Sequence, residues 1–335
     1  FGNRDMDNNS STFGDIVNPL GAGYNQQYAR NKLNITVWNA SHKGSYESGK
    51  HVFQWGQTVE LANISDRLQQ FEYRDSAGYS LPYQPGNLNI YNARYGVTEM
   101  DIRKFSGYVQ DNLQWAGSKH LVTLQAGVRY FYSDLNKEWI ISPRIQTSWK
   151  PTWKRDVVFR LAAGFYAQPP FYRELRLLDG SLNTSLIAQK SQQVVAGMDY
   201  RFKGLGSRPF RLSMEAYYKN ITDVIPYDVD NVRIQYLGSN NAKAFATGIE
   251  FRLFGELVKD AESWLSIGLM RTKENLSDDR YYEYKNAAGE IITPSTTDQV
   301  VTDSVQRDIG FLRRPSDRLL TIGLYLEDYL ATNKN

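Results

Sequence analysis

Hydrophobic and polar residues alternate along much of this chain, and the clearest example lies at 209–257. Within 210–218 every second residue is apolar, while the residues between them are polar or charged. A period of two indicates a β-strand with two unlike faces. The alternation returns at 249–253 after a turn near Pro226. The segment is therefore predicted to form an antiparallel hairpin with one apolar and one charged face.

The same period recurs elsewhere and predicts about a dozen strands in all. Besides the hairpin, strands are predicted at 32–42, 53–61, 99–115, 120–132, 141–149, 157–166, 194–202, 265–269 and 320–326. Short turns are predicted at 44–49, 116–118, 150–156, 203–208 and 256–263, and long loops at 63–98, 168–186 and 275–314. Short turns at one end and mostly longer loops at the other are typical of an outer-membrane barrel, whose short turns face the periplasm. The predicted fold is all-β, an antiparallel transmembrane β-barrel.

Composition removes several other classes of protein. The 335 residues contain no cysteine, which excludes a disulfide framework and a thiolate metal site. The 39 Lys+Arg nearly balance the 36 Asp+Glu, which argues against a general nucleic-acid binder. Mean hydropathy is -0.53, and no apolar run approaches the ~18 residues of a membrane-spanning helix. The 23 tyrosines, 15 phenylalanines and 7 tryptophans suit strands with rings at membrane interfaces.

A series of short motifs adds a second signal. The motifs are Ile141–Arg144, Gln168–Arg176, Tyr218–Asp223, Ala246–Glu250 and Arg313–Arg318. Together they resemble the barrel domain of TonB-dependent outer-membrane receptors, most closely those of Bacteroidetes. The resemblance spans nearly the whole chain, and its specificity comes from the series of motifs, because each motif alone is common.

The resemblance implies a barrel of about 22 strands whose lumen is closed by a plug domain. Residues 1–335 are accordingly expected to form part of one β-barrel domain, with the plug and the terminal strands outside this chain. The start of the chain agrees with this expectation. Residues 1–29 are polar and have neither the basic start nor the apolar core of a signal peptide, so they are predicted to be loop in a piece of a longer precursor.

The resemblance also implies TonB-dependent, energy-coupled uptake of a nutrient across the outer membrane of a Gram-negative bacterium. The residues leave open whether this nutrient is an oligosaccharide, a ferric chelate or a peptide. Expected partners are outer-membrane lipid and lipopolysaccharide, the receptor's own plug domain, a TonB-type energy coupler reached through the missing N-terminal part, and the nutrient ligand. No cofactor and no nucleic acid are expected. The alternative function is that of a passive porin or a structural or adhesin barrel.

Catalysis has little support in the sequence. His42, His51 and His120 lie at strand ends without an Asp–Ser partner at a recognisable spacing, so no hydrolase is expected. No His or carboxylate pair has the spacing of metal ligands. The turn at 204–207 is not followed by the helix that a phosphate-binding loop requires. We therefore expect neither catalytic nor metal-binding residues.

Two groups of residues are candidates for function. Charged residues on the polar faces of strands are expected to line a wet lumen, where they pair with one another or with the plug, or guide a polar substrate: Arg144, Arg160, Arg211, Glu215, Glu250 and Arg252. Residues near the extracellular strand ends are candidates for ligand contact, because rings stack on sugars and guanidinium groups hold carboxylates: Tyr166, Phe171, Tyr172, Arg173, Tyr281, Tyr282 and Tyr284.

Two further groups are expected to face lipid. The apolar stripe comprises Leu161, Leu212, Met214, Phe251, Leu253, Leu265, Ile267, Leu320, Ile322 and Leu324. Six tryptophans are expected mainly to form girdles at the membrane interfaces: Trp38, Trp55, Trp115, Trp139, Trp149 and Trp264.

Overall fold

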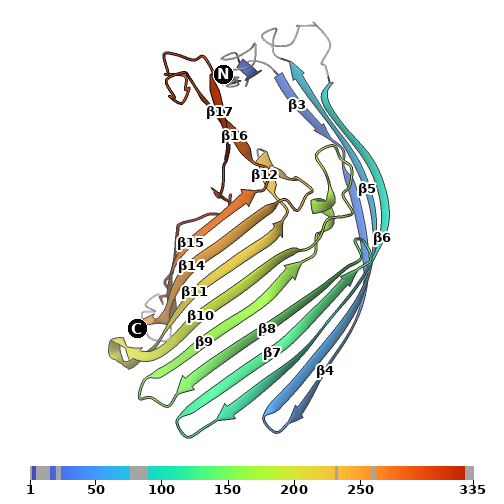
Figure 1. The fold of residues 1–335 in the computed structure, drawn as a ribbon. Helices are drawn as coiled ribbons and strands as arrows, with labels where there is room; N and C mark the ends of the chain where they lie inside the picture. Colours follow the sequence, from blue (N-terminus) through green and yellow to red (C-terminus); the bar gives the residue numbers. More distant parts are fainter. Residues whose placement is uncertain are drawn as a thin grey trace, which may run out of the picture.

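The protein forms a curved wall of antiparallel strands (Figure 1). A computed structural model describes residues 2–4, 16–19, 24–75, 90–230, 233–258 and 261–328. Within them, 13 strands belong to a single sheet. Their bounds are β3 (Tyr24–Ala29), β4 (Lys32–Ser48), β5 (His51–Asp75), β6 (Ile90–Ala116), β7 (His120–Ser133), β8 (Glu138–Pro151), β9 (Asp156–Gln168), β10 (Gln189–Gly204), β11 (Arg208–Val224), β14 (Ala242–Val258), β15 (Ala261–Leu276), β18 (Leu312–Arg313) and β19 (Leu320–Tyr325).

Smaller elements lie outside the wall. Three strand pairs form separate two-stranded sheets: β1 (Gly2–Arg4) with β2 (Ile16–Pro19), β12 (Tyr227–Asp230) with β13 (Arg233–Tyr236), and β16 (Arg280–Lys285) with β17 (Asp303–Asp308). Two short 3₁₀ segments are η1 (Tyr172–Leu175) and η2 (Leu205–Ser207). In the part of the chain that the structure describes, no helix has the length and apolar character needed to cross a bilayer.

The wall is an antiparallel meander, as the sequence predicts. From β5 to β11 each strand pairs with the next one along the chain, and β14 and β15 continue the order. One edge is formed by β3 and β4, which both pair with β5, and the other by β18 and β19, which both pair with β15. Across the described residues these two edges do not pair with each other, so the sheet is an open part of a barrel.

The connections differ in length at the two ends of the wall (Figure 1). Short turns join β4 to β5, β6 to β7, β8 to β9, β10 to β11 and β14 to β15. At the opposite end, 169–188 and 277–319 are long, as predicted, and 225–241 contains the β12–β13 pair where the sequence suggests only a turn near Pro226. The exception at that end is the short β7–β8 connection, 134–137.

The prediction of a long loop at 63–98 is wrong. β5 is 25 residues long and continues to Asp75, and β6 is 27 residues long and begins at Ile90. About 10 residues suffice to cross the bilayer, so both strands extend beyond it. There the outer face is polar, with Asn63 donating a hydrogen bond of 2.8 Å to Asp101. The apolar residues of this region, such as Ile64, are buried on the inner face, so the alternation is opposite to that of a membrane strand.

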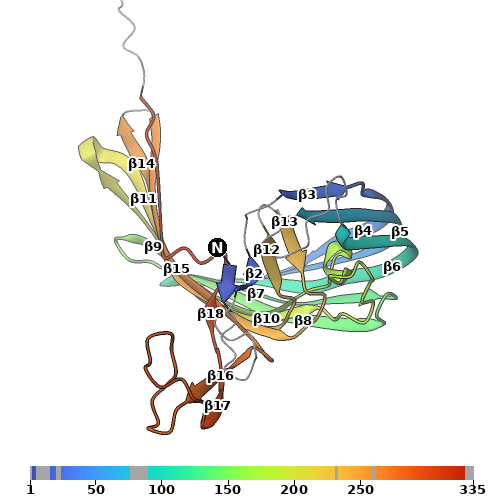
Figure 2. The same ribbon diagram turned by 90° about the horizontal axis from the view of Figure 1, so that it is seen from above.

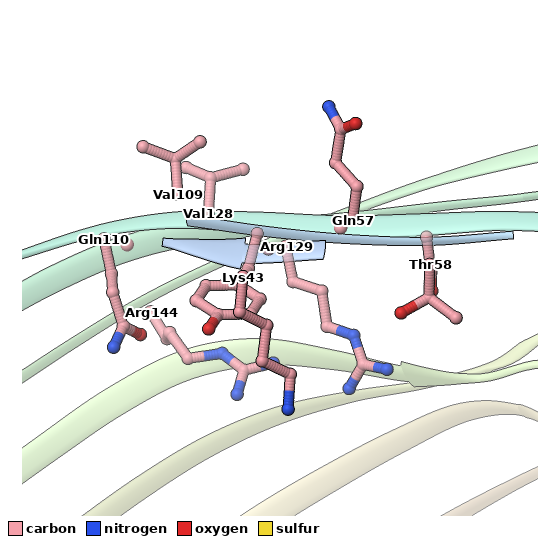
Figure 3. Close-up of a pocket in the computed structure, with 13 residues that line it drawn as sticks. Lys43, Gln57, Thr58, Val109, Gln110, Val128, Arg129 and Arg144 are labelled. Atoms are coloured by element: carbon pink, nitrogen blue, oxygen red, sulfur yellow. The ribbon is translucent and has the colours of Figure 1, made fainter. Parts of the chain in front are cut away.

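The strand register sorts side chains onto two faces. Leu212 on β11 lies opposite Leu253 on β14, and the next residue, Ser213, lies opposite Arg252. Carried across β8 to β19, this register places the ten residues of the predicted apolar stripe on one face and the six predicted lumen charges on the other. Figure 3 shows Arg144 pointing to the concave side and Val128 away from it. We call the concave side the inner face and the opposite side the outer face.

Tryptophans mark both ends of the apolar outer face. Trp139 and Trp149 share the outer face of β8, where each lies opposite an outer-face residue of β7. They lie about 33 Å apart along the strand at ~3.3 Å per residue. That length matches an apolar band of ~25 Å crossed by a strand tilted by ~40°. Trp264 does not belong to this set: it lies opposite Phe254 and Tyr325 on the inner face, because it is one residue out of step with the Leu265 stripe.

Candidate functional site

Charged side chains on the inner face mostly neutralise one another. Asp199 accepts hydrogen bonds from Arg211 at 3.0 and 3.1 Å, and Arg160 lies 3.2 Å from its other oxygen. Lys104 and Glu60 form an ion pair of 2.8 Å. Arg252 and Glu250, the adjacent pair of the predicted lumen set, are 2.9 Å apart.

A basic pocket on the inner face of β4 to β8 departs from this balance. It has a volume of about 350 Å³ and is lined by the cations Lys43, Arg129 and Arg144 together with Tyr108 and Gln110. In Figure 3 the three cationic side chains point to the same side of the sheet. Of these three cations, only Arg144 is among the residues predicted to face the lumen. Lys43 and Arg129 were missed because their neighbourhood depends on register across several strands.

Glycines on adjacent strands leave room for two of the side chains that line this pocket. A Cβ at Gly56 would lie 2.5 Å from Cε1 of Tyr108, and a Cβ at Gly164 would lie 2.8 Å from Cβ of Arg144. The missing side chains therefore let Tyr108 and Arg144 approach the neighbouring strand closely. The guanidinium of Arg144 lies 4.8 Å from the ring centroid of Tyr166, a cation–π arrangement that orients it. Tyr166, a predicted ligand contact, thus lies against Arg144 beside the basic pocket.

The long connection 169–188 is folded against the inner face of β5 and β6, and we call it the tucked segment. The Tyr172 hydroxyl donates a hydrogen bond of 2.6 Å to Asp66 on β5, and Arg176 donates another to the same carboxylate. At the far end of the segment, the Ala188 amide donates to Glu138 at 2.7 Å. The segment is therefore fixed to two different hairpins of the wall.

Apolar burial supports these polar ties. Leu175 and Leu186 are 0% and 1% exposed, and they cluster with Ile64 of β5 and Ile225. Glu174 is enclosed in the same region, where its carboxylate accepts hydrogen bonds from the Phe171 amide and the Gln189 side chain. Burial raises the pKa of Glu174 above its ordinary value of 4.5. The tucked segment is consequently a packed part of the wall.

The structure separates the predicted ligand contacts of this segment. Tyr172 is buried, and burial together with its hydrogen bond to Asp66 raises the pKa of its hydroxyl. Phe171 and Arg173 are exposed. The Phe171 ring packs edge-on against the Tyr236 ring, with 5.5 Å between the ring centroids, and the centroids of Tyr236 and Tyr227 are 6.0 Å apart. Tyr172 therefore holds the segment in place, while the exposed Phe171 ring meets two half-buried tyrosines of the β12–β13 pair that were not among the predicted contacts.

The predicted contacts Tyr281, Tyr282 and Tyr284 lie elsewhere. All three are on β16, whose pairing with β17 is supported by an ion pair of 2.9 Å between Arg307 and Glu283. In both views this pair of strands projects away from η1 (Figures 1 and 2). Tyr281 and Tyr282 are 46% and 53% exposed, so they remain accessible, but the structure does not bring them together with Phe171.

The described residues contain no cluster of side chains around a histidine that would form a catalytic or metal-binding site. His51 lies 2.7 Å from Asp111, and the strand register places both residues on the outer face near the short turns. No group of three or more His, Cys, Asp or Glu side chains that could hold a metal ion occurs in the residues searched, namely the described ones.

The comparison with protein families decides the identity of the wall. A family model described as "TonB dependent receptor-like, beta-barrel" matches residues 2–325. The chain belongs to this family. Its members are outer-membrane receptors and transporters. The wall described above is therefore that of a TonB-dependent receptor and lies in the outer membrane of a Gram-negative bacterium. The narrower assignment to Bacteroidetes stays a prediction.

Three solved structures are similar to parts of this chain. The outer-membrane transporter YddB from Escherichia coli is 16% identical with a TM-score of 0.45, covering 72% of this chain and 34% of that one. The siderophore receptor PirA from Pseudomonas aeruginosa is 16% identical with a TM-score of 0.43, covering 75% and 52%. The RagAB peptide transporter is 12% identical with a TM-score of 0.45, covering 90% and 39%. The chain thus spans from about a third to about half of these proteins. A search of curated proteins found no match.

Proposed function

We propose that this TonB-dependent receptor wall belongs to a receptor that takes up a nutrient across the outer membrane with energy from a TonB-type coupler. The family match over residues 2–325 carries the proposal. A polar inner face, an apolar outer face and long connections at one end supply what such a receptor needs: a wet path, a membrane anchor and a ligand-binding surface.

The same proposal includes further strands and a plug domain. An open sheet edge within a bilayer leaves backbone donors and acceptors without partners, which costs several kcal/mol per group. Additional strands that pair with β4 and β19 would remove this cost, and a plug would close the lumen. Contact of the outer face with lipid and lipopolysaccharide, and of the plug with the energy coupler, completes the proposed set of partners.

Deletion of the β16–β17 hairpin tests the receptor surface. A deletion of 280–308 is sharper than one of 275–314, because β18 pairs with β15 and Arg314 forms a 3.1 Å ion pair with Glu274. In the full-length receptor, we expect this deletion to abolish ligand binding while heat-modifiable barrel assembly is retained on gels. Normal uptake by the deletion variant would refute the role of this hairpin.

Planar-bilayer recording separates an energy-coupled receptor from a passive porin. A plugged receptor should show no steady single-channel conductance without an energy source, whereas a porin conducts. Energy-independent uptake of the nutrient by cells lacking the coupler would contradict the proposal.

Paired substitutions test which face meets lipid. An arginine at the bilayer midplane costs ~2–4 kcal/mol on the lipid face of a barrel strand and little on the inner face. We therefore expect Leu212→Arg to impair assembly and Ser213→Arg to be tolerated, as measured by the folded fraction after refolding into lipid vesicles. Equal yields from the two adjacent substitutions would contradict the assignment of faces.

A further inference from the structure

The basic pocket differs from the rest of the inner wall in its charge balance. Arg160, Arg211, Lys104 and Arg252 each have a carboxylate within 4.0 Å. For the pocket's cations Lys43, Arg129 and Arg144, by contrast, no ion pair occurs with any carboxylate of the described residues. The pocket therefore concentrates positive charge on a face that elsewhere neutralises itself.

The register explains how the three cations come together. Lys43 lies opposite Gly56, Gly56 opposite Tyr108, and Tyr108 opposite Arg129, so one row crosses four strands. Arg129 lies opposite Ser142, two residues from Arg144 on the same strand. Diagonal neighbours of this kind are about 7–8 Å apart, and long side chains reach across that distance. Like charges this close repel unless an anion lies between them.

The pocket is also organised before any ligand enters. Arg144 is held over the Tyr166 ring, and its buried Nε has no hydrogen-bond partner. A buried donor without a partner costs about 1–3 kcal/mol, more when it is charged. A carboxylate or phosphate oxygen would satisfy this donor and would also meet the planar fork of a guanidinium, which matches both groups in a bidentate manner.

We propose that this pocket is an anion subsite on the transport path, and that the nutrient carries at least two carboxylate or phosphate groups. The inference rests on the proposed uptake function and narrows its substrate class. Arg129 and Arg144 bind one anionic group, and Lys43, on the other side of the Tyr108 ring, forms an ion pair with a second. A neutral oligosaccharide would leave the three charges without a partner, so it fits the pocket poorly.

Binding of two small anions to the purified full-length receptor tests the proposal. Citrate represents carboxylates and pyrophosphate represents phosphates, and trimethyl citrate is the neutral control for citrate. Isothermal titration calorimetry is performed on the wild type, on the Arg129→Gln/Arg144→Gln double variant and on Lys104→Gln. Lys104 is the matched control because it lies on the same face but already pairs with Glu60.

We expect the wild type to bind at least one anion and not the neutral ester. Each charged hydrogen-bond group contributes about tenfold in affinity, so the double variant should bind about a hundredfold more weakly, while Lys104→Gln changes little. Arg129→Lys/Arg144→Lys should restore part of the loss, because it retains charge without the fork. Whichever anion binds more tightly identifies the source of the charged groups.

Two results would overturn the inference. One is a wild-type receptor that binds neither anion, or binds them equally well after the double substitution. The other is new ion conductance in the double variant with unchanged anion binding, which would mean that the pocket holds the plug. Either result leaves the uptake proposal standing if the receptor still imports a nutrient in a coupler-dependent manner, so the two failures are distinguishable.

Discussion

The tucked segment at 169–188 lies inside the curve of β5 and β6, whereas the β16–β17 hairpin within 277–319 projects from the end of β15 (Figures 1 and 2). Both connect neighbouring wall strands at the same end of the sheet. The first buries Leu175, Leu186 and Tyr172 and is tied to Asp66. The second is held by its own strand pairing, with Tyr282 more than half exposed.

This difference shows that length alone does not define a receptor loop. Aromatic residues occur in both connections, but burial decides their role. In the tucked segment an aromatic ring stabilises the wall, and in the hairpin it is available to a ligand. The following predictions separate these two roles.

Removing Asp66 should have the largest effect. Asp66→Ala leaves Arg176 and the Tyr172 hydroxyl without their acceptor, and breaking a buried pair from one side costs about 3–5 kcal/mol. We expect the tucked segment to detach, with rapid tryptic cleavage after Arg173 and Arg176. Glu283→Ala, placed in the other connection, should leave this cleavage slow. Equal protection in Asp66→Ala and wild type would show that the tie to β5 does not hold the segment.

The substitution Leu175→Ala, in the tucked segment, should have the second-largest effect. Leu175 is 0% exposed, and Leu→Ala changes at such sites cost about 2–5 kcal/mol. Hydrogen exchange should then accelerate at the Asn183 amide, which donates to the Leu175 carbonyl at 2.7 Å. Leu178→Ala is the matched control, because that leucine is 47% exposed and surface changes stay within about 0.5 kcal/mol. Similar exchange in both variants would contradict the packed arrangement.

Acidification should move the two connections in opposite directions. Glu174 has a raised pKa, so the folded segment binds a proton more readily than the unfolded one and gains stability as pH falls through that pKa. Arg307 lowers the pKa of Glu283, so the contribution of that pair is present at neutral pH and is lost as pH falls through the lowered value. Hydrogen exchange between neutral and acidic pH, corrected for intrinsic rates, checks both signs. A parallel response of the two regions would be contrary to expectation.

The smallest effect on stability is expected from Tyr282→Ala. The side chain is 53% exposed and its main ring contact is Tyr284 at 6.2 Å. The substitution should change the unfolding free energy by no more than about 0.5 kcal/mol. Nutrient binding by the full-length receptor should nevertheless weaken. An unaltered affinity would remove Tyr282 from the ligand-contact candidates.

Sequence reasoning succeeded where one face of a strand meets lipid. The alternation around Leu212 and Phe251 identifies strand, face and hairpin together, because lipid demands an apolar residue at every second position. It failed at 63–98, where the strands leave the bilayer and that demand ends. Trp264 was assigned to the wrong face because an aromatic residue suits either an interface or a lumen.

The candidate site was predicted less completely than the fold. Tyr166 and Arg144 were identified from strand position, and the structure shows them in contact. Lys43 and Arg129 come from distant strands, so only the register reveals them. Tyr172 was taken for an exposed contact because its partner, Asp66, is 106 residues away in the chain. Local pattern carries no information on a pairing of that range.

That separation has a consequence for the order in which the wall forms. Adjacent hairpins close over short stretches of chain, whereas the Asp66–Tyr172 contact closes a loop of 106 residues and gains nothing until β6 to β9 are aligned. Folding should therefore complete the hairpins first and secure the tie last. A wall interrupted at any intermediate strand would lack the tie and expose 169–188 to proteases, so the contact marks correctly finished assembly.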